Sequence, residues 1–178
     1  MQYYHKLILR YIIALIIRPT IFHWIFLPLT ILPTFLILRL LQFPALLRYE
    51  YNSIYLNNTI YSFVPACVAA FAYYLLILLI LLTKDISFKK SLYMFLIGSL
   101  LILVMNVIRV VILIIVLDKF GYSWFNVIHL TFWDFVSTLY VFFVWLFLIK
   151  MFKIKNIPVY GDIKTLYSKS LFHKRKKS

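Results

Sequence analysis

The chain has 178 residues, of which 65% are hydrophobic and 13% charged, whereas roughly a quarter are charged in an ordinary soluble domain. This composition excludes a water-soluble globular domain as the main structure. Only three glycines are present, and the apolar stretches are long, so they predict spanning helices rather than the alternating strands of an outer-membrane barrel. We therefore expect an all-α fold, a polytopic bundle with about four transmembrane helices.

The formal net charge is +14, from 19 lysines and arginines against five acidic residues. In a soluble protein this excess would suggest nucleic-acid binding, but no aromatic platform or binding motif accompanies it. Many of the cations instead follow the last apolar segment, where basic clusters fix membrane orientation and contact anionic lipid headgroups. They are Lys150, Lys153, Lys155, Lys164, Lys169, Lys174, Arg175, Lys176 and Lys177.

The first spanning helix is predicted over residues 19–38, which carry no formal charge. The apolar run at 7–17 extends this helix or lies at the membrane interface. Pro28 and Pro33 predict a kink, which membrane helices tolerate when neighbours satisfy the freed carbonyls. The polar stretch at 44–62 is predicted as the first loop, with a short interfacial or extended piece.

Three further helices are predicted, at 64–82, 91–117 and 130–149. Lysines and arginines are frequent near the N-terminus, between the second and third helices and in the tail, but rare in the other two loops. By the positive-inside rule both termini are cytoplasmic. We expect a transmembrane bundle over residues 1–150 and a basic cytoplasmic tail over 151–178, in the plasma membrane. The loops at 42–63 and 118–129 then face outward.

Cys67 is the only cysteine, which excludes an internal disulfide and a multi-cysteine metal site. It lies in the sequence VPACVAA, predicted to open the second helix with Pro65 at its first position. Exposed amides and the helix dipole favour a thiolate there, the nucleophilic form of cysteine. The alternative is that Cys67 is a small packing residue. The neighbouring alanines fit tight packing or leave room for a peptide.

Arg109 interrupts the apolar run at 100–117, where a charge costs at least about 2.5 kcal/mol. It falls in the outer half of the bilayer, and Asn106 shares its helix face three residues earlier. The alternative is a structural role, in which Arg109 reaches the interface or pairs with Asp134.

His129 opens the fourth helix on the same outer side, and an imidazole suits proton transfer near neutral pH. The alternative is an interfacial anchor. Together the residues form the inventory of a thiol acyl-transfer site, with Cys67 as nucleophile, His129 as base and then acid, and Arg109 as oxyanion stabiliser. The histidines lack the spacing of a helical zinc pair. We expect no metal and no organic cofactor.

These motifs resemble the exosortase and archaeosortase family of multi-pass membrane transpeptidases. The resemblance covers about residues 20–150. It rests on Pro65-Ala66-Cys67, then Asn106-Val107-Ile108-Arg109, then His129, with Asn52-Ser53-Ile54-Tyr55-Leu56 as the polar lead-in. Many relatives carry Ser-Gly after the cysteine, whereas this chain has Val68-Ala69.

The resemblance implies catalytic roles for Cys67, Arg109 and His129, with Asn106 in support. It also implies a substrate class, secreted proteins with a C-terminal recognition motif, one transmembrane helix and a basic cluster. Cleavage would occur on the extracytoplasmic side through a thioacyl enzyme, which an amine, a membrane lipid or water resolves. No nucleic acid is involved.

Two alternatives stay open. In the first, the chain is a non-catalytic membrane subunit or a small transporter, with Cys67 as packing and Arg109 in an ion pair with Asp134. Transporters usually carry repeats or broken helix pairs, which the sequence lacks. In the second, the chain is an inactive relative that binds sorting tails without cleaving them.

Overall fold

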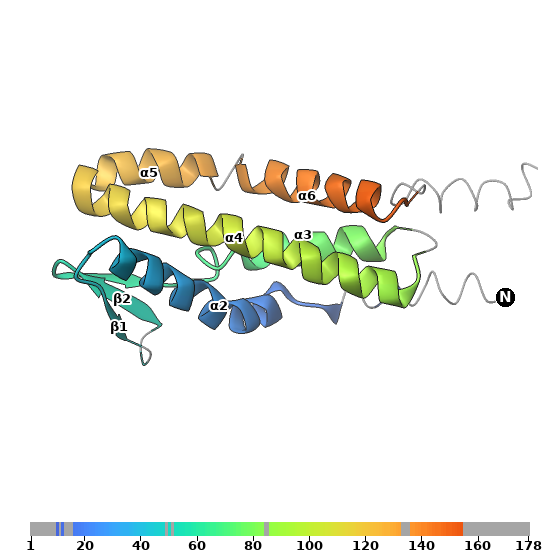
Figure 1. Cartoon of the computed structure of the whole chain (residues 1–178), viewed down its shortest axis with the longest axis horizontal. Helices are drawn as coiled ribbons and strands as arrows, with labels where there is room; N and C mark the ends of the chain where they lie inside the picture. Colours follow the sequence, from blue (N-terminus) through green and yellow to red (C-terminus); the bar gives the residue numbers. More distant parts are fainter. Residues whose placement is uncertain are drawn as a thin grey trace, which may run out of the picture.

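The chain folds into an elongated helical bundle with a small sheet at one end (Figure 1). The computed structural model describes residues 10, 12, 16–48, 50, 52–83, 86–132 and 136–154. The predicted all-α class holds for the bundle but misses the sheet, which forms from the polar stretch predicted as the first loop. Of the predicted basic tail, residues 155–178 lie outside the described part.

Two helices are long and apolar enough to cross a membrane, α2 (Pro19–Leu40) and α4 (Phe88–Phe120). Pro19 lies at the start of α2, where its missing N–H removes no helical hydrogen bond. The fully buried hydroxyls of Thr30 and Thr34 donate to carbonyls one turn earlier, at 2.9 and 2.7 Å. The helix therefore satisfies its own buried polar groups.

The remaining helices of the structure differ from the predicted ones. The second helix, α3 (Ala70–Leu81), begins later than residue 64. The outer loop predicted at 118–129 is largely helical, because α4 continues to Phe120 and Gly121 then turns the chain into α5 (Tyr122–Thr131). Gly121 has a φ of +79°, which glycine adopts without steric cost. The last helix, α6 (Ser137–Met151), begins after the predicted start at residue 130.

The sheet contains three antiparallel strands in the order β1 (Leu46–Arg48), β2 (Ser53–Leu56) and β3 (Thr59–Ser62). A two-residue turn joins β2 to β3, and both of its residues, Asn57 and Asn58, have positive φ. This backbone suits the twist of a tight hairpin. The predicted extended piece of the first loop is thus confirmed.

Asp118, near the end of α4, ties the hairpin to the bundle. The Asn57 side-chain amide donates to both of its carboxylate oxygens, at 3.0 and 3.2 Å. Burial raises the pKa of the Tyr61 hydroxyl above its usual value, and the Asp118 carboxylate raises it further. The sheet therefore lies beside α2, at the end of the bundle opposite to Phe88 (Figure 1), and Asn57 links it to α4.

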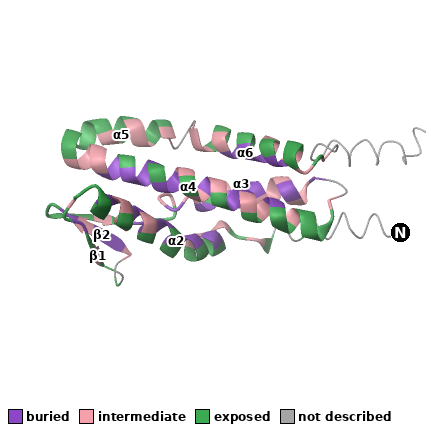
Figure 2. Cartoon of the chain, in the orientation of Figure 1, coloured by how far each residue is buried: buried purple, intermediate pink, exposed green. Residues whose placement is uncertain are grey.

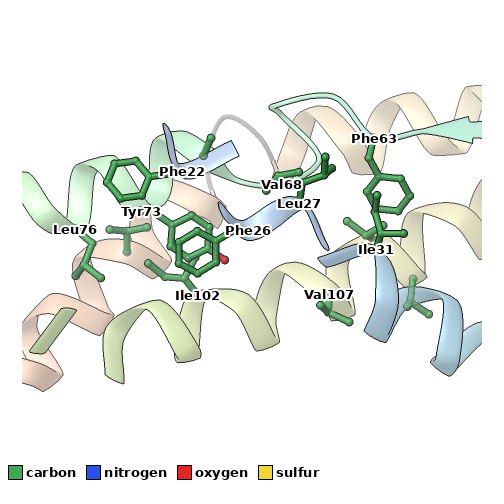
Figure 3. Close-up of a cluster of buried hydrophobic side chains, with 14 of the residues drawn as sticks. Phe22, Phe26, Leu27, Ile31, Phe63, Val68, Tyr73, Leu76, Ile102 and Val107 are labelled. Atoms are coloured by element: carbon green, nitrogen blue, oxygen red, sulfur yellow. The ribbon is translucent and has the colours of Figure 1, made fainter. Parts of the chain in front are cut away.

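The core forms where α2, α3, α4 and α6 meet, as the buried residues in Figure 2 show. The rings of Phe26 and Tyr73 stack across α2 and α3 with centroids 3.7 Å apart (Figure 3). The outer faces are also apolar, with Trp24 68% and Phe143 60% exposed. Helices that are apolar on every side are typical of membrane bundles.

Gly98 lies where α4 approaches α3 and α6. A Cβ there would come within 2.7 Å of Leu76 Cδ2 and 2.9 Å of Leu148 Cδ1. We expect Gly98→Ala to be tolerated, because both atoms end flexible side chains. Gly98→Leu should destabilise the bundle by about 1–3 kcal/mol through overpacking, although leucine favours a helix more than glycine does. Unfolding in mixed detergent micelles measures this change.

Val104→Leu is the matched control, because Val104 lies on the exposed face of the same helix. It should leave stability unchanged. A Gly98→Leu variant as stable as the wild type would contradict close packing of α3 and α6 at Gly98.

Candidate active site

Cys67 lies in a run of turns, residues 65–69, that precedes α3. We call this run the Cys67 segment. The prediction that Cys67 lies one turn inside a helix is therefore wrong. The Cys67 amide donates to the Val64 carbonyl at 2.8 Å, closing a turn instead. Ala69 then enters α3 from the left-handed region, with φ of 57°, a conformation that costs a non-glycine residue roughly 1–2 kcal/mol.

The segment is anchored next to the cysteine by Val68, which is fully buried. Figure 3 shows Val68 beside Leu27 of α2. Cys67 itself is partly exposed and its thiol is free. The free thiol therefore belongs to a partly exposed residue whose backbone is held in place.

Two side chains of α4 hold the backbone of this segment. Asn106 Nδ2 donates to the Cys67 carbonyl at 2.9 Å, and an Arg109 terminal nitrogen donates to the Ala66 carbonyl at 2.8 Å. Residues three apart share one helix face, so one face of α4 supplies both donors. The structure thus brings together Cys67, Asn106 and Arg109, which lie far apart in the sequence.

Arg109 is only 4% exposed. Its other terminal nitrogen is 3.5 Å from Ser137 Oγ, at the limit for a hydrogen bond, and Ser137 donates to the Phe132 carbonyl at 2.7 Å. The guanidinium also lies within electrostatic range of the Cys67 thiol and the Tyr73 hydroxyl. The buried guanidinium is therefore a positive charge next to the backbone of the Cys67 segment.

Two polar atoms in this cluster have no hydrogen-bond partner within the described part of the chain, Arg109 Nε and Asn106 Oδ1. An unpaired buried donor or acceptor costs about 1–3 kcal/mol. Asp134, the alternative ion-pair partner of Arg109, lies outside the described residues. Among the acidic residues that are described, none forms a salt bridge with Arg109.

Two adjoining cavities meet at Arg109. The larger, of about 210 Å³, lies between the start of α3 and the first turns of α6. The smaller, of about 30 Å³, is lined by both Asn106 and Arg109. Ala69, Ala72, Arg109, Ser137 and Val141 line both. The side chains that flank Cys67, rather than its own, form the wall of the larger cavity.

His129 lies in the last turn of α5, not at the start of the last helix as predicted. Its ring stacks on Phe125, with centroids 5.3 Å apart and an interplanar angle of 6°. No hydrogen bond or ion pair joins it to Cys67, Asn106 or Arg109 among the residues that the structure describes. The imidazole is thus outside the cluster on α3, α4 and α6.

Ser137 was not predicted as a site residue, whereas Ala66, Ala69 and Ala70, which line the larger cavity, are the alanines expected either to pack tightly or to leave room for a peptide. A signal for Ser137 exists in the sequence, since a hydroxyl interrupts the last apolar run on the side predicted to face outward. In the described part of the chain, no group of three or more histidine, cysteine, aspartate or glutamate side chains could hold a metal ion. The chain matches no protein family, no curated protein and no solved structure.

Proposed function

We propose that this chain is a membrane-embedded cysteine transpeptidase, similar in site and substrate class to the exosortases and archaeosortases. It cleaves C-terminal sorting signals of secreted proteins on the extracytoplasmic side. The observation that carries the proposal is the pair of hydrogen bonds from Asn106 and Arg109 to the backbone of the Cys67 segment. They link a potential nucleophile to the one arginine buried in the long helix α4.

The membrane setting explains why these two side chains are needed. Within hydrocarbon every backbone polar group must find a partner inside the protein. With 12 residues, α3 is about 18 Å long, short of the ~30 Å hydrocarbon core. The Cys67 segment completes this span with turn hydrogen bonds, the longest of them 3.4 Å, and Asn106 and Arg109 add close donors to the Cys67 and Ala66 carbonyls.

We assign four spans to α2, α3, α4 and α6. The 33 residues of α4 measure about 50 Å, so its Phe120 end projects beyond the hydrocarbon with the sheet. Both termini are cytoplasmic and the sheet is extracytoplasmic, following the distribution of lysine and arginine. Arg109 then lies about 16 Å from the end of α4, near the outer membrane boundary.

In the proposed reaction the Cys67 sulfur attacks the carbonyl carbon of the scissile peptide bond. Arg109 stabilises the negative charge on the carbonyl oxygen, using the N–H at Nε that has no partner in the described chain. His129 accepts the thiol proton and passes it to the leaving amine as the carbon–nitrogen bond breaks. This requires His129 to approach the thiol when substrate binds, and catalytic hydrogen bonds often form only in the complex.

The products of this step are a thioacyl enzyme and the released tail with its transmembrane helix. An amine or hydroxyl of an acceptor, most simply a lipid headgroup, then attacks the thioester carbonyl and the Cys67 thiolate leaves. His129 removes the acceptor's proton and returns it to sulfur. No oxidant, reductant or cofactor enters either step.

Co-expression of the chain with a secreted reporter tests the proposal. The reporter carries a C-terminal recognition motif, one transmembrane helix and a basic cluster, and loss of this tail is followed by a mobility shift and by mass. A reporter without the motif is the control. Tail removal that is equal with and without the chain would overturn the proposal.

The topology predicts a separate labelling result. In a Cys67→Ala background, Thr59→Cys in the exposed hairpin strand should react with a membrane-impermeant maleimide added to intact cells. Lys89→Cys, exposed at the start of α4, should react only after permeabilisation. The reverse pattern would place the candidate active site on the cytoplasmic side and contradict an extracytoplasmic reaction.

A further inference from the structure

The larger cavity is lined mostly by apolar atoms, and the Arg109 side chain also lines it. Alanines of the Cys67 segment and α3 form one wall, Val141 of α6 forms the other, and Arg109 lies between them. Phe71 and Thr138 line the cavity and are exposed, so it opens on the outer surface between α3 and α6. That surface is apolar on both helices, with Phe71 60% and Phe142 46% exposed.

The unpaired atoms are one donor and one acceptor, from Arg109, which lines both cavities, and from Asn106, which lines only the smaller adjoining one. Arg109 Nε can donate and Asn106 Oδ1 can accept, and both side chains are 4% exposed. They come from positions three apart on α4, so their Cβ atoms are about 5–6 Å apart. In an antiparallel strand pair, one residue both donates its N–H and accepts at its C=O toward the same neighbour. Arg109 Nε and Asn106 Oδ1 therefore supply the one donor and the one acceptor that the backbone of one residue of an extended peptide needs.

We infer that the cavity between α3 and α6 is a peptide subsite that admits an apolar side chain next to the scissile bond. The carbonyl of that residue accepts from Arg109 Nε, and its N–H donates to Asn106 Oδ1. Its side chain fills the 210 Å³ cavity. The substrate enters sideways between α3 and α6, so its transmembrane helix stays in lipid. This inference rests on the proposed function and adds to it a preference for an apolar side chain next to the scissile bond.

A peptide backbone fits these observations better than the phosphate group of a lipid. A phosphate group accepts hydrogen bonds and would satisfy Arg109 Nε, but it has no N–H to donate to Asn106 Oδ1. The described part of the site also offers no second arginine or lysine for a phosphate, since Arg109 is the only cation among the residues that line the two cavities.

Peptidyl chloromethyl ketones test the subsite on the purified full chain in lipid nanodiscs. Cys67 is the only cysteine, so intact mass reports its alkylation, in which sulfur displaces chloride. Three probes are compared, acetyl-Ala-Phe, acetyl-Ala-Gly and acetyl-Ala-(N-methyl)Phe chloromethyl ketone. The rate of each probe with the chain is divided by the rate of the same probe with free glutathione, which removes differences in intrinsic reactivity. The Cys67→Ala variant checks that no other residue reacts.

We expect the Phe probe to react at least about tenfold faster than the Gly probe, because it fills the cavity. N-methylation should slow the Phe probe by about tenfold, because it removes the N–H that donates a hydrogen bond to Asn106 Oδ1. Equal normalised rates for the three probes would overturn the subsite. If a phospholipid also co-purified with the chain, it would be the occupant of the cavity instead. These probe comparisons need no variant and so do not depend on its folding.

Ala72→Leu extends the test, because Ala72 lines both cavities. It should abolish the preference for Phe over Gly while leaving alkylation by iodoacetamide within about twofold, since that small reagent needs no subsite. Val104→Leu should keep the preference. An unchanged preference in Ala72→Leu would overturn the subsite even if Cys67 proved essential for tail removal. Loss of the Cys67 requirement would instead overturn the proposed function.

Discussion

If the proposed function is right, Cys67→Ala abolishes removal of the sorting tail, lowering its rate by at least about a thousandfold, as loss of the nucleophile does in acyl-transfer enzymes. The substitution is well suited to the test, because both hydrogen bonds from α4 end on backbone carbonyls of the Cys67 segment. Alanine keeps those carbonyls. The fold and the substrate-binding surface should therefore survive while the sulfur is lost.

Cys67→Ser sharpens this prediction. Serine keeps the size and a potential nucleophile, but its hydroxyl is far less acidic than a thiol and the site was not arranged to deprotonate it. We expect activity close to that of Cys67→Ala. The measurement is the fraction of reporter without its tail, normalised to the amount of enzyme in the membrane.

Val64→Ala is the matched control, since Val64 immediately precedes the Cys67 segment and is 50% exposed. Its activity should equal that of the wild type. Processing by Cys67→Ala at the wild-type rate would exclude Cys67 as the nucleophile, whereas a loss shared by Val64→Ala would point to the backbone of the segment rather than to the sulfur.

The relation between Asn106 and Arg109 was predictable from the sequence, because helical periodicity alone puts residues three apart on one face. The structure of the Cys67 segment was not. Pro65 is a good first residue of a helix, so the sequence favoured a helix through Cys67. The decisive contacts come from α4, whose side chains replace helical amides as partners of the Ala66 and Cys67 carbonyls. Such long-range partners are not visible in local sequence.

The sequence contains indications of the sheet and of α5, but they are weaker than the pattern of long apolar runs. The sequence SIYLNNTIYS places two asparagines between short runs rich in β-formers, which is a hairpin signal. Gly121, directly after α4, permits the turn into α5. Counting charges predicts only the side of the membrane on which a polar connection lies, and it carries no information on whether that connection is coil, strand or helix.

The position of His129 shows a further limit of reasoning from order along the chain. Cys67 and Arg109 lie close because α3 and α4 pack directly against each other. His129 was expected only at the same membrane surface, and its ring stacks on Phe125 one turn earlier in α5. Order along the chain therefore does not predict which of the three side chains are in contact.

Arg109→Lys is expected to lower tail removal by about a hundredfold to a thousandfold, the range for loss of one oxyanion donor. Lysine keeps the positive charge, but its three N–H groups share a single nitrogen. It cannot hold the Ala66 carbonyl and still present a separate N–H where Nε stands. The variant therefore separates charge from the planar arrangement of donors.

Arg39→Lys is the matched control, since Arg39 is an exposed arginine in the last turn of α2, and it should process the reporter at the wild-type rate. Alkylation of Cys67 by iodoacetamide in the Arg109→Lys variant tells a direct role from a positioning role. If lysine still donates to the Ala66 carbonyl, the rate of alkylation stays near that of the wild type while tail removal falls, which indicates a direct role for Arg109. A rise in alkylation with the loss of activity would mean that Arg109 acts by fixing the Cys67 segment, and full activity in the lysine variant would exclude any need for the guanidinium fork.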